Sequence, residues 1–279
     1  MGKPGQAVAN TGLIVAAIRA RESRRPDRLF DDPYAARLAG ASGEQLLTDM
    51  IAEAGEQSSL QIVVRTRFLD EALLRVVPPI RQVVILAAGM DARAYRLPWP
   101  AGTTVYELDQ PAVLTAKAEA LAGEQPSCTR VPIGVDLTEN WQDAMQVNGF
   151  DPGEPAVWLI EGLLQYLDGD AVRTLFARID SLSASGSLSA SGSVLLYDIV
   201  GKTLLDAQLL ASVRRTMARS GAPWLFGTDQ PGELAQAHGW SAIVTDVAVP
   251  GNAWHRWFAP AVPMDVPDVP RGYFVEAIR

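Results

Sequence analysis

The feature that most constrains the fold is a short apolar strand that runs into a glycine and an acid and opens a regular alternation of strands and helices. Residues 81–88 form a β-branched run of the kind that is buried in a parallel sheet, and Gly89-Met90-Asp91 follows it. Further strands are expected at 103–108, 129–135, 156–160, 194–198, 241–247 and 272–278. Helices are expected among them at 112–122, 140–147, 170–182, 203–219 and 230–238. This alternation predicts an α/β fold with a doubly wound, mostly parallel sheet.

The end of the chain sets this sheet apart from a six-stranded dinucleotide fold. The last two strands are separated only by an expected loop at 250–271, so they are expected to pair as an antiparallel edge. Seven strands that end in this way indicate the Rossmann-like layout of class I methyltransferases. Before the sheet, residues 11–22, 34–54 and 60–77 are predicted helices, the first capped by Asn10 or Thr11 and the last ended by Pro78-Pro79.

Composition narrows the class of partner. The net charge is −8, and the only basic run is 19–28, which argues against nucleic acid or an anionic membrane and favours a small molecule. One cysteine and two histidines are too few for a disulfide or a convincing metal site, so no metal is expected. The first residues lack the features of a signal peptide, from which a cytoplasmic location is expected.

A perfect six-residue duplication occupies 181–192, where Ser-Leu-Ser-Ala-Ser-Gly occurs twice in succession. Serine and glycine at this density predict a flexible loop. Because the segment enters a strand, we expect the loop at the amino-terminal edge of the sheet, away from any ligand.

Acidic residues end the first five strands, at the edge where open α/β sheets bind their ligands. They are Asp91, Glu107 with Asp109, Asp136, Glu161 and Asp198. A phosphate would be repelled by such an edge. S-adenosylmethionine (SAM) has a sulfonium, an ammonium, two ribose hydroxyls and an adenine amine, which acidic acceptors satisfy. The single Gly89, where a dinucleotide fingerprint has three glycines, also disfavours NAD.

Spacing assigns roles to some of these acids and leaves others open. Asp109 lies 20 residues beyond Gly89, the usual distance for an acid that binds ribose hydroxyls. Glu107 points to the same side of the strand and either shares that role or is a solvated acid. Either Asp136 and Leu137 bind the adenine, or Asp136 is the N-cap of the helix that follows.

Several motifs resemble the leucine carboxyl methyltransferase family, and in particular its bacterial branch of SAM-dependent O-methyltransferases of natural-product type. The motifs are Pro26 to Tyr34 (PDRLFDDPY), Val64 to Asp70 (VRTRFLD), Val84 to Leu97 (VILAAGMDARAYRL), Val105 to Pro111 (VYELDQP) and Glu161 to Leu167 (EGLLQYL). The likeness covers about residues 10–200.

The resemblance implies a SAM site with named residues. Arg65 would hold the carboxylate of SAM, Gly89 its methionine part, Asp109 the ribose, Asp136 and Leu137 the adenine, and Glu161 the region of the ammonium. Arg67 is a second candidate for contact with an anion. S-adenosylhomocysteine (SAH) would be the product. The whole chain, 1–279, would be one methyltransferase domain, with 1–79 a helical lid, 80–279 the core, and insertions at about 201–230 and 250–271 shaping an acceptor pocket.

Methyl transfer from a sulfonium is an in-line displacement in which the protein mainly positions the reactants. A carboxylate acceptor is already ionised at neutral pH, whereas a phenol benefits from a base, for which His255 is a candidate; His238 is expected to be structural. We therefore expect O-methylation of the carboxylate of a natural-product-like acid. The aromatic residues expected to line its pocket are Trp224, Phe226, Trp254 and Trp257. Three alternatives are a hydroxyl O-methyltransferase, an NAD(P)-dependent oxidoreductase and a non-catalytic SAM-binding protein.

Overall fold

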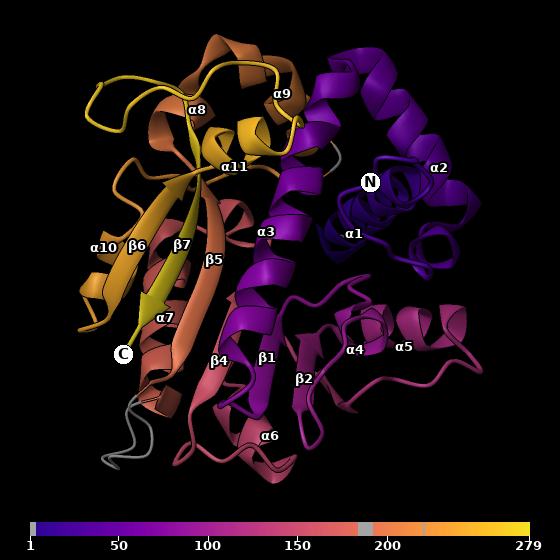
Figure 1. Cartoon of the computed structure of the whole chain (residues 1–279), viewed down its shortest axis with the longest axis vertical. Helices are drawn as coiled ribbons and strands as arrows, with labels where there is room; N and C mark the ends of the chain where they lie inside the picture. Colours follow the sequence, from indigo (N-terminus) through magenta and orange to yellow (C-terminus); the bar gives the residue numbers. More distant parts are fainter. Residues whose placement is uncertain (1–3, 184–191, 220) are drawn as a thin grey trace.

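Seven strands form one sheet in the order β3-β2-β1-β4-β5-β7-β6 (Figure 1). A computed structural model describes residues 4–183, 192–219 and 221–279. The strands are β1 (Gln82–Leu86), β2 (Thr104–Asp109), β3 (Thr129–Gly134), β4 (Ala156–Ile160), β5 (Val194–Val200), β6 (Ser241–Asp246) and β7 (Gly272–Ile278). β1 to β5 pair in parallel, and β7 is antiparallel to both β5 and β6. The predicted seven-stranded sheet with an antiparallel final strand is confirmed, although β7 lies inside the sheet and β6 forms the edge.

Each predicted helix overlaps a helix of the structure, and the described residues form further short helices that were not predicted. Those outside the sheet connections are α1 (Pro4–Ser23), α2 (Ala35–Ala54), η1 (Glu56–Ser59) and α3 (Leu60–Val76). Those between strands are α4 (Arg93–Arg96), α5 (Pro111–Ala120), α6 (Gln142–Val147), η2 (Leu164–Tyr166), α7 (Gly169–Ser183), α8 (Lys202–Asp206), η4 (Gln208–Leu210), α9 (Ala211–Arg219), α10 (Glu233–Gln236) and α11 (Ala248–Ala253).

The buried strands place alternate side chains on opposite faces of the sheet. Val84 and Leu86 of β1 belong to a core with α6 and α7, in which Trp141 and Trp158 are fully buried. Val83 and Ile85 face the other way, into a second core built with the apolar side of α3. The sheet is therefore covered on both faces, as its continuous apolar strands require.

A third core lies where α1 and α2 pack on each other beside α3, around the carboxyl end of β1 (Figure 1). Ala17 and Leu38 meet there, together with Met90 from the loop after β1. The two helices approach closely at Gly43, where an added Cβ would lie 2.7 Å from the carbonyl oxygen of Leu13. This helical layer closes over the edge of the sheet at which the acids were predicted.

Five local features differ from the predictions. The helix expected to begin after Asn10 or Thr11 begins at Pro4. The single helix expected at 203–219 is divided into α8, η4 and α9, because Ala207 has an extended backbone with ψ 142°. The expected loop at 250–271 begins within α11, and α4 follows Asp91 where no helix was predicted. Ser181 to Ser183 of the predicted loop form the last turn of α7, and 184–191 lie outside the described residues.

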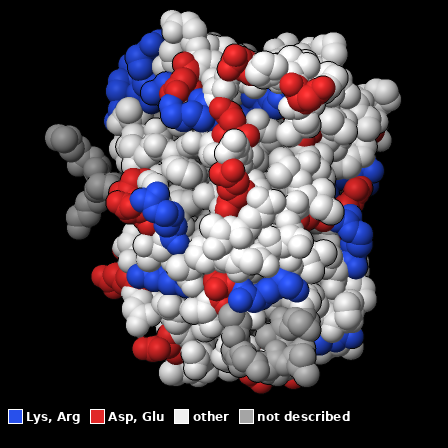
Figure 2. Space-filling model, turned by 90° about the vertical axis from the view of Figure 1, so that its left-hand side faces the viewer, with Lys and Arg blue, Asp and Glu red and all other residues white. Residues whose placement is uncertain are grey.

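The side of the molecule that carries β6 and α10 mixes positive and negative side chains, with broad uncharged areas between them (Figure 2). The edge strand β6 exposes Ile243 on this side of the sheet, at 65% of its full accessible area. Among the helices described, none is long and apolar enough to cross a membrane.

Candidate active site

A cavity of about 450 Å³ opens at the carboxyl ends of the parallel strands, beneath α1 and α2. Parallel strands end at one edge, so residues distant in sequence meet there. The charged residues that line it are Arg19, Asp49, Glu53, Arg65, Asp91, Asp109, Glu161 and Asp198. The apolar residues include Ile14, Leu46, Met50, Leu163, Val200, Leu204, Leu210, Val213, Met217 and Trp224. One space therefore joins an acidic region to an apolar one.

Gly89 and Asp109 are in direct contact at the first two strand ends. The backbone N–H of Gly89 donates to Oδ2 of Asp109 over 2.7 Å, and the N–H of Gln110 donates to Oδ1 over 2.6 Å. Gly89 has a φ of 46°, in the left-handed region that favours glycine. Burial raises the pKa of Asp109, and the two N–H donors oppose that shift. The spacing of 20 residues thus corresponds to a hydrogen bond between the loop after β1 and the end of β2, which are neighbouring strands.

Glu161 lies at the centre of a buried ion network just after β4. Its Oε1 accepts from Arg19 over 2.7 Å and from Arg65 over 3.0 Å, and its Oε2 accepts from Arg93 over 2.5 Å. Arg65 also donates to Asp198 over 3.1 Å. Burial alone would raise the pKa of Glu161, but the charges of Arg93, Arg19 and Arg65 outweigh it and hold the pKa far below its ordinary value of 4.5.

A second row of ion pairs lies behind this network. Arg93 is fully buried and donates to Asp91 and, over 2.7 Å, to Asp70 of α3. Asp70 accepts two further bonds from Arg96, at 2.7 and 2.8 Å, and Arg96 lies 3.4 Å from Asp32. Three of the motifs quoted above therefore meet in one network that supports the cavity wall.

Sequence reasoning assigned no role to Arg19 or Arg93. Arg93 stands inside a motif that was noticed for its glycine, and nothing in its spacing reveals that it faces Asp91 and Glu161. Arg19 belongs to the basic run 19–28, which reads as a surface feature, yet only 3% of its area is exposed. A charged residue within the apolar stripe of a predicted helix was the available signal.

The predicted adenine and ribose partners differ in their placement. Asp136 and Leu137 are not among the residues that line the cavity. Asp136 accepts from the N–H and hydroxyl of Thr138, which lowers its pKa, and the next helix is capped at Trp141, so Asp136 is not its N-cap. Glu107 is fully buried and binds Lys117 and Arg130, so its predicted exposure to a ligand or to solvent was wrong.

Of the four aromatic residues expected in the acceptor pocket, only Trp224 lines the cavity. Phe226 packs on the core beneath α7. Trp254 and Trp257 pack on a small core around Val64, Val247 and Phe274, and the guanidinium of Arg67 stacks on Trp254 at 4.4 Å. Arg67 also binds Glu71 and does not line the cavity.

The histidines lie elsewhere. His255 is exposed, with a φ of 56°, in the turn after α11, and His238 follows α10. Neither lines the cavity, so the expectation of His255 as a base has no geometric support. Within the described part of the chain, no group of three or more His, Cys, Asp or Glu side chains is arranged to hold a metal ion.

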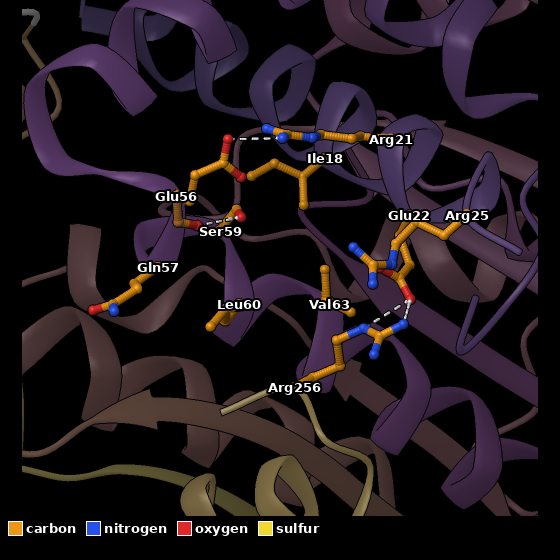
Figure 3. A pocket seen from close by; sticks show the side chains of 10 residues that line it. All are labelled: Ile18, Arg21, Glu22, Arg25, Glu56, Gln57, Ser59, Leu60, Val63 and Arg256. Atoms are coloured by element: carbon orange, nitrogen blue, oxygen red, sulfur yellow. Dashed lines mark hydrogen bonds and ion pairs between the residues drawn. The ribbon is translucent and has the colours of Figure 1, made fainter. Parts of the chain in front are cut away.

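A smaller cavity of about 130 Å³ lies between α1, η1 and the start of α3 (Figure 3). Beside it, Glu22 at the end of α1 accepts from Arg256, at 3.2 and 3.3 Å, and both side chains are buried. Arg21 pairs with Glu56 across the same cavity. α1 is thus tied to the sheet edge by Arg19 and to the turn after α11 by Glu22.

Comparisons with known proteins agree with this arrangement. A candidate S-adenosyl-L-methionine-dependent methyltransferase of Mycobacterium sp. (strain KMS) is 47% identical, over 98% of this chain and 93% of its own. A protein of the same description from Mycobacteroides abscessus is 42% identical over 86% of each chain. A candidate methyltransferase of Thermobifida fusca has the same fold, with a TM-score of 0.61, 18% identity and coverage of 91% of this chain and 94% of its own.

The family match covers the part of the chain that builds most of the cavity wall. Residues 12–180 match the family described as leucine carboxyl methyltransferase. These residues contain most of α1, all of α2 to α6, most of α7, and β1 to β4, and hence both rows of the ion network except Asp198. The chain belongs to the leucine carboxyl methyltransferase family.

Proposed function

We propose that this chain transfers a methyl group from SAM to the carboxylate of a small, largely apolar acid, releasing SAH and a methyl ester. Its family and the description of its relatives support a SAM-dependent methyltransferase. The observation that carries the proposal is a single cavity that is acidic at the strand ends and apolar beyond them.

The side chains that line the cavity fit this cofactor. Of the charged side chains that line the cavity, six are carboxylates and two are arginines. The cavity therefore favours a ligand with cationic groups. Asp109 would accept from the ribose hydroxyls, Gly89 would lie along the methionine part, and Arg65 would hold the carboxylate. A carboxylate accepts about four hydrogen bonds, and Glu161 already accepts three, so it has room for one from the ammonium.

Adenine recognition by Asp136 and Leu137 remains part of the proposal. Leu137 packs at the margin of the core under α7, and its carbonyl oxygen accepts from Arg178 over 2.9 Å. This bond fixes the loop after β3 next to the strand end that carries Asp109. The same loop would then offer one carboxylate and one N–H to the base.

The reaction needs alignment more than proton transfer. When bound, SAM supplies an electrophilic methyl group on a positively charged sulfur. A lone pair of the acceptor oxygen forms the new O–C bond as the C–S bond breaks and its electrons return to sulfur, so charge is balanced and no proton moves. The carboxylate is ionised at neutral pH. A site without a histidine can therefore serve it, because its task is positioning.

The test is methyl transfer from SAM labelled in its methyl group to a panel of monocarboxylic acids and phenols. We expect label in an organic product that mild base hydrolyses, as it does an ester. Label in a base-stable aryl ether would replace the carboxylate by a hydroxyl acceptor. No transfer to any panel member, from protein that binds SAH, would favour a non-catalytic role.

A further inference from the structure

The helix α9 is amphipathic, yet none of its residues is buried. Leu210, the last residue of η4, and Val213 and Met217 of α9 recur at helical spacing, and all three line the cavity. Arg215 and Ala218 are exposed. The apolar side of this helix therefore borders the cavity and not a filled core.

The opposite wall of this region comes from α2. Leu46 and Met50 of α2 line the same cavity as Val213 and Met217. The two helices are joined at their rim, where the hydroxyl of Thr216 donates to Oε1 of Glu53 over 2.7 Å. The space between α2 and α9 is thus an apolar slot with a polar rim, continuous with the region of Asp109 and Glu161.

The charged residues that line the slot are acidic, and Arg219 at the end of α9 lies 3.9 Å from one of them, Glu53, at the rim. Asp49 and Glu53 of α2 line it, whereas the cations that line the cavity, among the residues described, are Arg19 and Arg65. Both arginines bind Glu161 at the other end. A second anionic group inside the slot would therefore meet two carboxylates, and the cation beside them, Arg219, already pairs with Glu53.

We infer that the acceptor is an apolar monocarboxylic acid whose hydrocarbon body lies between α2 and α9, and that Asp49 and Glu53 reject acceptors with a second anionic group. The inference rests on the proposed function, because the single carboxylate is paired with the sulfonium of SAM and needs no cation from the chain. Apolar burial then supplies most of the affinity. Diacids, phosphorylated acids and acidic peptides are excluded by like charge.

The test compares two ligands that differ by one carboxylate, dodecanoate and dodecanedioate, binding to the full chain saturated with sinefungin, an unreactive SAM analogue that has an ammonium in place of the sulfonium. Calorimetry should give a Kd for dodecanoate at least tenfold lower than that for the diacid. Equal affinity, preference for the diacid, or binding of neither ligand overturns the inference. The measurement involves no turnover, so failure of methyl transfer counts against the proposed function alone.

Two variants of α9 differ only in the face that receives the new charge. Val213→Asp should weaken dodecanoate at least tenfold and leave the Kd of SAH within about twofold. Ala218→Asp, on the exposed face, should change neither value. Equal effects of the two variants would show that α9 does not contact the acid.

The role of Glu53 at the rim is tested by the preference of the slot for the monoacid over the diacid. Glu53→Gln keeps an oxygen that can accept from Thr216 but removes the negative charge. The preference for dodecanoate over dodecanedioate should fall at least threefold, chiefly through tighter binding of the diacid. An unchanged ratio would remove Glu53 from the inferred role.

Discussion

Asp109 is both a scaffold and a candidate ligand. Its two oxygens accept from the N–H groups of Gly89 and Gln110, which fixes the loop after β1 against the end of β2. Burial raises the pKa of Asp109, and the two N–H donors offset only part of the cost of burying its negative charge. A ribose with two hydroxyl donors would supply the missing compensation.

Replacement of this carboxylate tests the role directly. Asp109→Ala should weaken SAH binding about 100-fold, since each hydrogen bond to a charged group contributes about 1.5–3 kcal/mol. Isothermal calorimetry gives the affinity, and circular dichroism checks that the fold is retained. Glu119→Ala, an exposed acid on α5, is the matched control. An affinity near that of the wild type would refute the assignment.

Glu161 compensates three arginines, so its charge should matter for stability. Glu161→Gln leaves Arg19, Arg65 and Arg93 with a neutral partner in a buried site. We expect the free energy of unfolding to fall by about 3 kcal/mol at pH 7. Urea denaturation measures this, and Glu71→Gln, at an exposed pair with Arg67, should change it by less than about 1 kcal/mol.

The same variant has a defined pH dependence. Because the pKa of Glu161 is lowered in the folded state, its stabilisation is fully present above the ordinary value of 4.5 and is lost as pH falls from there toward the folded value. The difference in stability between the wild type and Glu161→Gln should therefore be constant from pH 8 to 6 and shrink below about pH 4.5. A difference that shrinks instead between pH 6 and 8 would identify another group as its source.

At the scale of elements, the contact of α1 with α2 shapes the cavity. Gly43→Ala would place a methyl group 2.7 Å from the carbonyl oxygen of Leu13, so α1 must shift. We expect a loss of about 1–3 kcal/mol of stability and weaker SAH binding, because α1 lines the cavity through Gly12 and Ile14. Denaturation and calorimetry measure both effects, with Ser42→Ala, exposed on the same helix, as control. SAH binding unchanged in the destabilised variant would separate α1 from the cofactor.

Elements with a strong period were predictable from the sequence, and those defined by tertiary contacts were not. β4 and β7 were predicted to the residue, because apolar runs between turns carry their own signal. The order of β6 and β7 in the sheet was not predicted. The sequence indicated that the two strands pair with each other, but not which of them lies next to β5. α9 looked like part of a longer helix because Ala207, where the chain breaks, is itself a good helix former.

The same limit applies to the site. Its acids were found because strand ends converge by topology. The arginines were missed, or were given only ligand roles, because pairing depends on side-chain geometry: Arg65 binds Glu161 and Asp198 within the protein. Trp254 and Trp257 were misplaced because residues of the turn after α11 look alike in sequence whether they face a ligand or pack on α3, as Trp254 does.

For the whole molecule, ligand binding should appear as global stabilisation, because the cavity joins the helical layer to the sheet. SAH at 100 times its Kd adds about 2.7 kcal/mol to the free energy of unfolding and should raise the Tm by about 5–10 °C. Thermal denaturation with SAH and with NAD measures this. A shift with NAD and none with SAH would contradict the assigned cofactor.

The position of β7 also has a consequence for biosynthesis. β5 and β6 are both made before β7, yet each borders β7 in the finished sheet. During translation β5 therefore keeps an unpaired edge while more than 70 residues follow it, and β6 has no partner strand at all. A nascent chain with such open edges is prone to pair with neighbouring chains on a polysome. The yield of folded protein should therefore depend on chaperones and on synthesis rate more than the stability of the finished protein would indicate.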